Sequence, residues 1–166
     1  MSESTVTQNE KKRGWWPALV IFEAVTLGLG ALNGFLTSKS MSIYDTLQQP
    51  PLAPPGWVFP VAWSILYAAM ALSAFLIWRE GSAEARGLLL LWGAQLLVNL
   101  AWPWIFFVLH AYGLAFLWLL VLWILVLLLM LSSFRRNHAA GWLLVPYLLW
   151  VTFAGYLNLM IAFLNP

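Results

Sequence analysis

Five long apolar stretches, separated by short polar segments, dominate this 166-residue sequence. Each is close to the ~20 residues that an α-helix needs to cross a hydrocarbon layer ~30 Å thick. Only 8% of the residues are charged, whereas about a quarter are charged in an average soluble domain, so the chain has too few charges to cover a surface in water. Uninterrupted runs of this length favour helices over the alternating strands of a membrane barrel. We therefore expect an all-α, polytopic membrane protein, a bundle of five transmembrane helices over about residues 15–36, 57–78, 87–107, 112–132 and 140–163.

The positive charges gather on one side of such a bundle. Residues 1–14 form a polar tail, and the connections after the second and fourth spans are basic; the cations on this side are Lys11, Lys12, Arg13, Arg79, Arg86, Arg135 and Arg136. The opposite side carries Lys39 alone. Short loops rich in Lys and Arg stay in the cytoplasm. We therefore expect a protein of the bacterial inner membrane with a cytoplasmic N-terminus, an external C-terminus and one membrane domain over residues 15–166.

One connection, residues 37–56, is longer than the others. It contains Pro50, Pro51, Pro54 and Pro55. Each proline fixes φ and removes an N–H donor, so the segment is predicted to be stiff and extended. It is either a rigid connector or a lid over the end of the bundle, and because long ordered loops are commonly functional, we favour the lid.

Aromatic, amide and small side chains recur at helical spacing in three of the spans. Each set falls on one helix face: Trp63, Tyr67, Met70 and Ala74 in the second span, Gln95, Asn99, Trp102 and Phe106 in the third, and Tyr147, Trp150, Ala154 and Asn158 in the fifth. Pro103 and Pro146 each free the backbone carbonyl four residues earlier, because proline has no N–H. Polar groups in hydrocarbon need partners, so these faces could serve helix–helix packing. They could equally line a pocket for a flat, mostly apolar molecule.

Motifs for catalysis are missing from the sequence. It contains no HExxH, GxSxG or phosphate-loop pattern and no cysteine. Glu23 is the acidic residue well inside a span; such a carboxyl is either functional or a protonated structural group, and we assign it no role. The net charge of +2 is too small for a nucleic-acid-binding surface. We therefore expect no nucleic-acid partner, no metal site and no required cofactor.

Three ordered blocks of residues extend over most of the chain. The first runs from Tyr44 and Leu47 through Pro50, Pro54, Pro55, Trp57 and Phe59 to Trp63, Tyr67 and Trp78, the second is Gln95-x-x-x-Asn99-x-Ala101-Trp102-Pro103, and the third is Pro146-Tyr147-x-x-Trp150-x-x-Phe153-Ala154-x-x-Leu157-Asn158. Together they resemble the TspO/MBR family. That family comprises the tryptophan-rich sensory proteins and the mitochondrial translocator protein, also called the peripheral benzodiazepine receptor.

The resemblance implies a five-helix bundle, commonly a homodimer, whose cavity is closed by the first loop. It also implies that the ligands are porphyrins and other haem-type tetrapyrroles, or drug-like molecules of the isoquinoline-carboxamide and benzodiazepine types. By motif position, the ligand-binding residues would be Trp57, Tyr67, Asn99, Trp102, Tyr147, Trp150 and Ala154. The rings would stack on the flat ligand, while the Asn99 amide and the indole N–H groups would supply directional hydrogen bonds.

These observations support three hypotheses of function. The leading hypothesis is a membrane receptor or sensor for tetrapyrroles, with a transport or regulatory role. The second is a porphyrin-degrading membrane enzyme with Trp57 near the macrocycle, as proposed for some members of the family; it is less favoured because tryptophan is not an acid–base group. The third is a scaffold without a ligand. For association into a homodimer, the third span offers the small residues Gly87, Gly93, Ala94 and Ala101.

Overall fold

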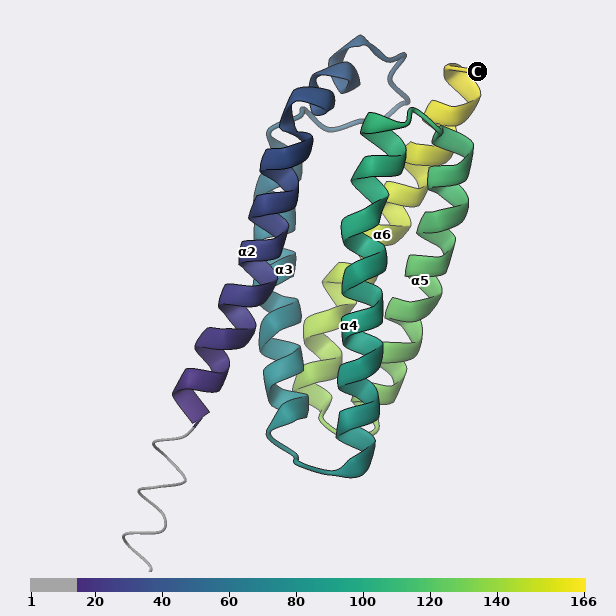
Figure 1. Ribbon diagram of the computed structural model, residues 1–166. Helices are drawn as coiled ribbons and strands as arrows, with labels where there is room; N and C mark the ends of the chain where they lie inside the picture. The colour runs from purple at the N-terminus through teal and green to yellow at the C-terminus, as the bar shows by residue number, and fades with distance from the viewer. Residues whose placement is uncertain (1–14) are drawn as a thin grey trace, which may run out of the picture.

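The computed structural model describes residues 15–166, which are helical apart from short connections (Figure 1). Five helices in this range are long and apolar enough to cross a membrane. They are α2 (Trp15–Met41), α3 (Val58–Trp78), α4 (Ala83–Pro103), α5 (Tyr112–Phe134) and α6 (His138–Leu164). Two short segments, η1 (Ser42–Thr46) and η2 (Trp104–Val108), continue α2 and α4. The predicted all-α bundle of five transmembrane helices is therefore confirmed, whereas the predicted tail over residues 1–14 lies outside the described part of the chain.

Several helix boundaries differ from those that the sequence pattern predicted. Ser82 accepts a hydrogen bond from the backbone N–H of Ala85 (3.0 Å), so α4 begins at Ala83 rather than near residue 87. Asn137 caps α6 in the same way through the N–H of Ala140 (3.1 Å). The connections after α3 and α5 are short as a result.

At its C-terminal end, α2 continues to Met41, although residues 37–41 were expected to belong to the loop. The hydroxyls of Thr37 and Ser38 donate to backbone carbonyls of the preceding turn, those of Asn33 (2.9 Å) and Phe35 (2.7 Å). These polar side chains are therefore satisfied within the helix and give the chain no reason to leave it.

The helices run up and down, so the connections alternate between the two ends of the bundle. In Figure 1 the α3–α4 and α5–α6 connections lie at the lower end, and the α2–α3 and α4–α5 connections lie at the upper end with the C-terminus. The lower end carries Arg79, Arg86, Arg135 and Arg136. Arg136 forms an exposed ion pair with Glu84 (3.6 Å) there, which contributes little to stability.

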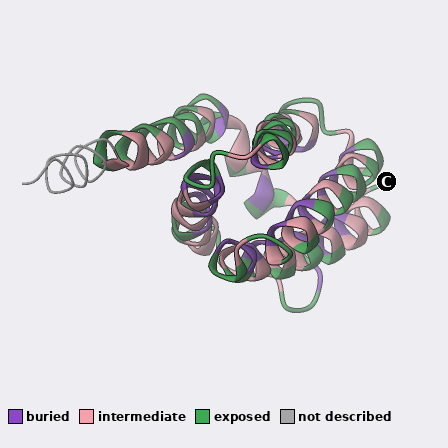
Figure 2. Cartoon of the chain, turned by 90° about the horizontal axis from the view of Figure 1, so that it is seen from below, coloured by how far each residue is buried: buried purple, intermediate pink, exposed green. Residues whose placement is uncertain are grey.

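Helix α2 lies at the edge of the bundle. It packs chiefly on α3, and only Thr26 and Thr37 among its residues are buried. Figures 1 and 2 show its N-terminal half leaning away from the other four helices. Closer to its middle, Gly30 lies against the ring of Tyr67 on α3, so closely that a Cβ atom at this position would overlap the ring. The glycine therefore sets how near the two helices approach.

Pro103 changes the helical geometry at the end of α4. Because proline offers no N–H, the chain opens into the wider turn of η2, in which the N–H of Leu109 reaches the carbonyl of Trp104, five residues back (2.9 Å). In η2 the neighbouring residues Phe106 and Phe107 are both buried. They form an apolar cluster at the upper end, with the buried residues Tyr44, Ala115 and Ile161 and with partly buried neighbours that include Met41, Phe59 and Trp102.

The proline-rich connection after η1 is held against the end of α6. The side chain of Asn165 accepts a hydrogen bond from the backbone N–H of Gln48 (2.9 Å) and donates one to its carbonyl (3.2 Å). The hydroxyl of Tyr156 donates to the carbonyl of Pro51 (2.9 Å). The connection is thus anchored at two points to the helix that ends beside it.

The close approach at Gly30 is tested by comparing two glycines of the same helix. Gly30→Leu should displace the Tyr67 ring and destabilise the protein by about 1–3 kcal/mol, the usual cost of overpacking. Gly28→Leu should be neutral or slightly stabilising, because a Cβ at Gly28 meets open space and leucine is the better helix former. Thermal unfolding in detergent measures both; equal melting temperatures for the two variants would contradict the packing described here.

Candidate ligand-binding cavity

A chain of buried hydrogen bonds links three helices in the middle of the bundle. The hydroxyl of Tyr67 donates to Asn99 Oδ1 (2.7 Å), Asn99 Nδ2 donates to the hydroxyl of Tyr147 (3.0 Å), and that hydroxyl donates to Gln95 Oε1 (2.8 Å). All four side chains are buried. Without water, each group must find its partner in the protein, so these bonds fix α3, α4 and α6 relative to one another at this level.

Two further sets of bonds join the helices above this chain. The indole N–H of Trp102 donates to Asn158 Oδ1 (3.1 Å), and Asn158 Nδ2 donates to the carbonyl of Tyr112 (2.8 Å). On α2, Asn33 Nδ2 donates to the carbonyl of Leu100 (3.1 Å), and Asn33 Oδ1 accepts from the indole of Trp104 (2.7 Å). Asn33 thereby ties α2 to the end of α4.

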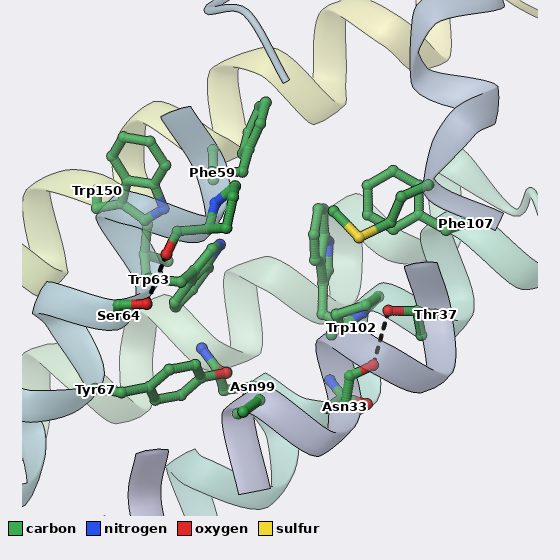
Figure 3. Close-up of a pocket in the computed structure, with 18 of the residues that line it drawn as sticks. Asn33, Thr37, Phe59, Trp63, Ser64, Tyr67, Asn99, Trp102, Phe107 and Trp150 are labelled. Carbon is green, nitrogen blue, oxygen red and sulfur yellow. Dashed lines mark hydrogen bonds between the residues drawn. The ribbon is translucent and has the colours of Figure 1, made fainter. Parts of the chain in front are cut away.

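A cavity of about 580 Å³ lies among all five helices, within the range of pockets that hold drug-sized molecules. Six aromatic residues line it: Phe59, Trp63, Tyr67, Trp102, Phe107 and Trp150. Figure 3 shows Phe59, Trp63, Tyr67 and Trp150 on one side of the pocket and Trp102 and Phe107 on the other. No residue that lines it in the described part of the chain is charged. The cavity therefore suits a ligand with extended apolar faces.

Two residues that line the cavity, Trp63 and Trp150, have indole N–H groups that make no hydrogen bond within residues 15–166. The indole nitrogen of Trp150 is buried and unbonded, whereas Tyr67, Asn99 and Trp102 use their polar atoms in the helix–helix contacts above. The Trp150 ring is held by edge contacts with Phe59 (centroids 6.1 Å apart) and Trp63 (6.5 Å). A buried donor without a partner costs free energy, so a ligand that offers an acceptor to this N–H would be favoured.

Five of the seven residues predicted to bind a ligand line this cavity: Tyr67, Asn99, Trp102, Trp150 and Ala154. Trp57 does not line this cavity. It precedes the first residue of α3 and is 68% exposed. Tyr147 does not line the cavity either. It is fully buried behind the lining and acts through its hydrogen bonds to Asn99 and Gln95.

Helix α2 also contributes to the cavity, although none of its residues was predicted to bind a ligand. Eight residues of this helix line the cavity, and they include Gly30, Asn33, Gly34 and Thr37. The signal that could have revealed them is the concentration of small residues between Gly28 and Ser38, which is unusual beside large apolar side chains. Glu23, also on α2, is partly buried and lies outside the cavity lining.

An open groove runs along the outside of the bundle between α3 and α6. It is lined by Ala62, Ile65, Leu66, Pro146, Leu149, Trp150 and Phe153. Trp150 therefore belongs both to this outer groove and to the inner cavity. Elsewhere in residues 15–166, no group of three or more His, Asp or Glu side chains is placed to hold a metal ion.

Fold and cavity together define a polytopic helical membrane protein with an internal, aromatic-lined cavity, and comparison with known proteins gives the family. The sequence model of the TspO/MBR family matches residues 21–164. The chain is 38% identical over 151 residues to the tryptophan-rich sensory protein of Cereibacter sphaeroides, which covers 90% of this chain and 92% of that protein. It is 40% identical over 127 residues to Protein CrtK of Rhodobacter capsulatus (74% and 78% covered) and 34% identical over 147 residues to the human translocator protein (87% of each). The chain belongs to the TspO/MBR family, which confirms the resemblance found in its sequence.

The buried hydrogen bonds predict that two tyrosines of α6 contribute unequally to the stability of the protein. Tyr147→Phe should destabilise the protein by about 1–2 kcal/mol, because it leaves Asn99 Nδ2 and Gln95 Oε1 buried without a partner. Tyr156→Phe removes an equivalent hydroxyl that bonds to Pro51 at an exposed position and should cost less. The stability of the two variants is compared by unfolding them in the same detergent. An equal loss of stability would show that the buried hydrogen bonds of Tyr147 do not stabilise the bundle.

Proposed function

We propose that this protein is a membrane receptor or sensor that binds tetrapyrroles, such as porphyrin or haem-related molecules, and similar flat apolar ligands in the cavity. The observation that carries the proposal is the unpaired indole N–H of Trp150 at a cavity lined by six aromatic residues. Aromatic rings on two sides of the pocket can stack on the faces of a planar ligand, and the indole can donate to an acceptor on it (Figure 3).

The names of relatives support a receptor or transport role. One is a tryptophan-rich sensory protein and another is a translocator protein. In this chain, transport or regulation would follow from occupancy of the cavity, and binding needs no further cofactor. The alternative of a scaffold without a ligand receives no support from a bundle that contains a cavity of this size.

The alternative of a porphyrin-degrading enzyme is not favoured by the geometry. It required Trp57 to touch the macrocycle, but Trp57 is exposed and lies outside the cavity lining. We therefore propose binding as the function of the cavity and assign no catalytic residue.

Ligand binding is tested by titrating the purified protein with protoporphyrin IX and following the quenching of tryptophan fluorescence. We expect saturable binding. Trp150→Phe keeps an aromatic ring but removes the free donor, so it should weaken binding about five- to ten-fold, the value of one hydrogen bond. Asn99→Ala should also weaken binding, because Asn99 lines the cavity and positions Tyr67.

Trp142→Phe is the matched control for this titration, since Trp142 lies on the same helix, is 65% exposed and does not line the cavity. It should bind as the parent does. If Trp150→Phe and Asn99→Ala also bind like the parent, the cavity is not the binding site.

We further propose that the protein sits in the bacterial inner membrane with its C-terminus outside. Support comes from the charges at the two ends of the bundle. The end with the α3–α4 and α5–α6 connections carries four arginines, whereas Lys39 is the basic residue at the opposite end of the described chain. Because the helices run up and down, the first residue of α2 lies at the arginine-rich end. The N-terminus would then be cytoplasmic.

This orientation predicts opposite results for two reporter fusions in a bacterial host. Alkaline phosphatase joined to Pro166 by a flexible linker should be active, because it would lie outside the cytoplasm. The same enzyme inserted after Glu80, in the arginine-rich connection, should be inactive. Activity in the second fusion and not in the first would invert the proposed orientation.

For the proposed homodimer, the outer face of α4 is the surface we favour. Small and large residues alternate along it at a spacing of three and four: Gly87, Leu90, Ala94, Leu97, Ala101 and Trp104. Leu90 and Leu97 are 77% and 70% exposed in the single chain. Small residues repeated on one face let two membrane helices approach closely. Gly93 lies three residues after Leu90 and four before Leu97, so it borders this surface.

A further inference from the structure

We propose that ligands reach the cavity sideways from the hydrocarbon of the membrane, through an opening between α2 and α3. The inference rests on the proposed ligand-binding function and concerns the route to the same cavity. Five residues line the cavity and are nevertheless exposed. On α2 these are Ala31, Gly34 and Ser38, and on α3 they are Pro60 and Ser64.

These residues form two facing edges of one opening. Ala31, Gly34 and Ser38 are spaced by three and four residues, and Pro60 and Ser64 by four, so each set lies along one side of its helix. All five side chains are small or absent. Figure 3 places Ser64 of α3 and Thr37 of α2 on opposite sides of the pocket, with the pocket between them. A hollow bounded by exposed residues on both sides communicates with whatever surrounds the bundle at that level, which is lipid.

The other boundaries of the cavity are closed by contacts. Toward the middle of the membrane, Gly30 lies against the ring of Tyr67, so α2 and α3 are in close contact at that level. On the α4 side, Asn33 bonds to the carbonyl of Leu100 and to the indole of Trp104, which fastens α2 there. At the upper end lies the apolar cluster built on Tyr44, Phe106 and Phe107, with the connection anchored to Asn165 and Tyr156 beyond it.

The chemistry of the opening suits molecules dissolved in lipid. The hydroxyls of Ser38 and Ser64 donate to carbonyls of their own helices, those of Phe35 (2.7 Å) and Pro60 (2.8 Å). They are therefore satisfied without water, and the rim presents mainly carbon to a passing ligand. The ligand class that this route admits is an apolar or amphiphilic molecule that partitions into the bilayer before it binds.

Gly34 provides a direct test, because a Cβ added there meets open space and a large side chain grown from it would stand in the opening. Association and dissociation of protoporphyrin IX are measured by stopped-flow tryptophan fluorescence with the protein in lipid nanodiscs. In Gly34→Phe the association and dissociation rate constants should both fall at least ten-fold. Gly34→Leu should give a smaller decrease of the same kind.

Two matched glycine variants serve as controls. Gly28→Phe adds the same ring to α2 away from the cavity, and Gly56→Phe adds it to the connection at the upper end; a Cβ at either position meets open space. Both should keep the parent's rates. Unchanged rates in Gly34→Phe, or slowing in Gly56→Phe alone, would overturn the lateral route. If Gly34→Phe does not bind protoporphyrin IX, the test uses Gly34→Leu, and unchanged rate constants in that variant would overturn the lateral route. If the parent itself shows no saturable binding, the proposed function fails, and the lateral route fails with it.

Discussion

The absence of water from the interior of the membrane is the constraint on which the rest of this structure depends. Each polar side chain between the helices must find a protein partner, and Asn99 is where this requirement has the largest effect. Its amide accepts from Tyr67 and donates to Tyr147, which places α3, α4 and α6 at one level. These hydrogen bonds support the lower part of the cavity, whereas Gln95 Nε2 beside them and the indole of Trp150 at the lining have no partner in residues 15–166.

A second feature, Pro103, determines how the cavity ends. Phe106 and Phe107 follow Pro103 in η2. The wider turn that follows the proline lets both rings lie in the same buried cluster with Tyr44. Loss of one backbone hydrogen bond at Pro103 is thus accompanied by an aromatic layer at the upper end of the site.

Much of the site could be predicted from the sequence wherever helical periodicity and polarity coincide. Tyr67, Asn99 and Trp150 stand out because each follows a helical repeat in an otherwise apolar span. Trp57 precedes α3, so no repeat fixes the direction of its side chain. The part played by α2 could not be found in this way, because one side of this helix meets lipid and the other meets a mostly apolar cavity, and both sides therefore have similar composition.

Trp150 has a consequence that extends beyond the cavity itself. Its ring lines the inner cavity and also the outer groove between α3 and α6, so at this point the wall of the bundle is a single indole thick. An acyl chain in the groove and a molecule in the interior would therefore press on the same side chain. The lipid composition of the surrounding bilayer would then affect the shape of the cavity. The fluorescence emission of Trp150 would respond both to an acyl chain in the groove and to a molecule in the cavity.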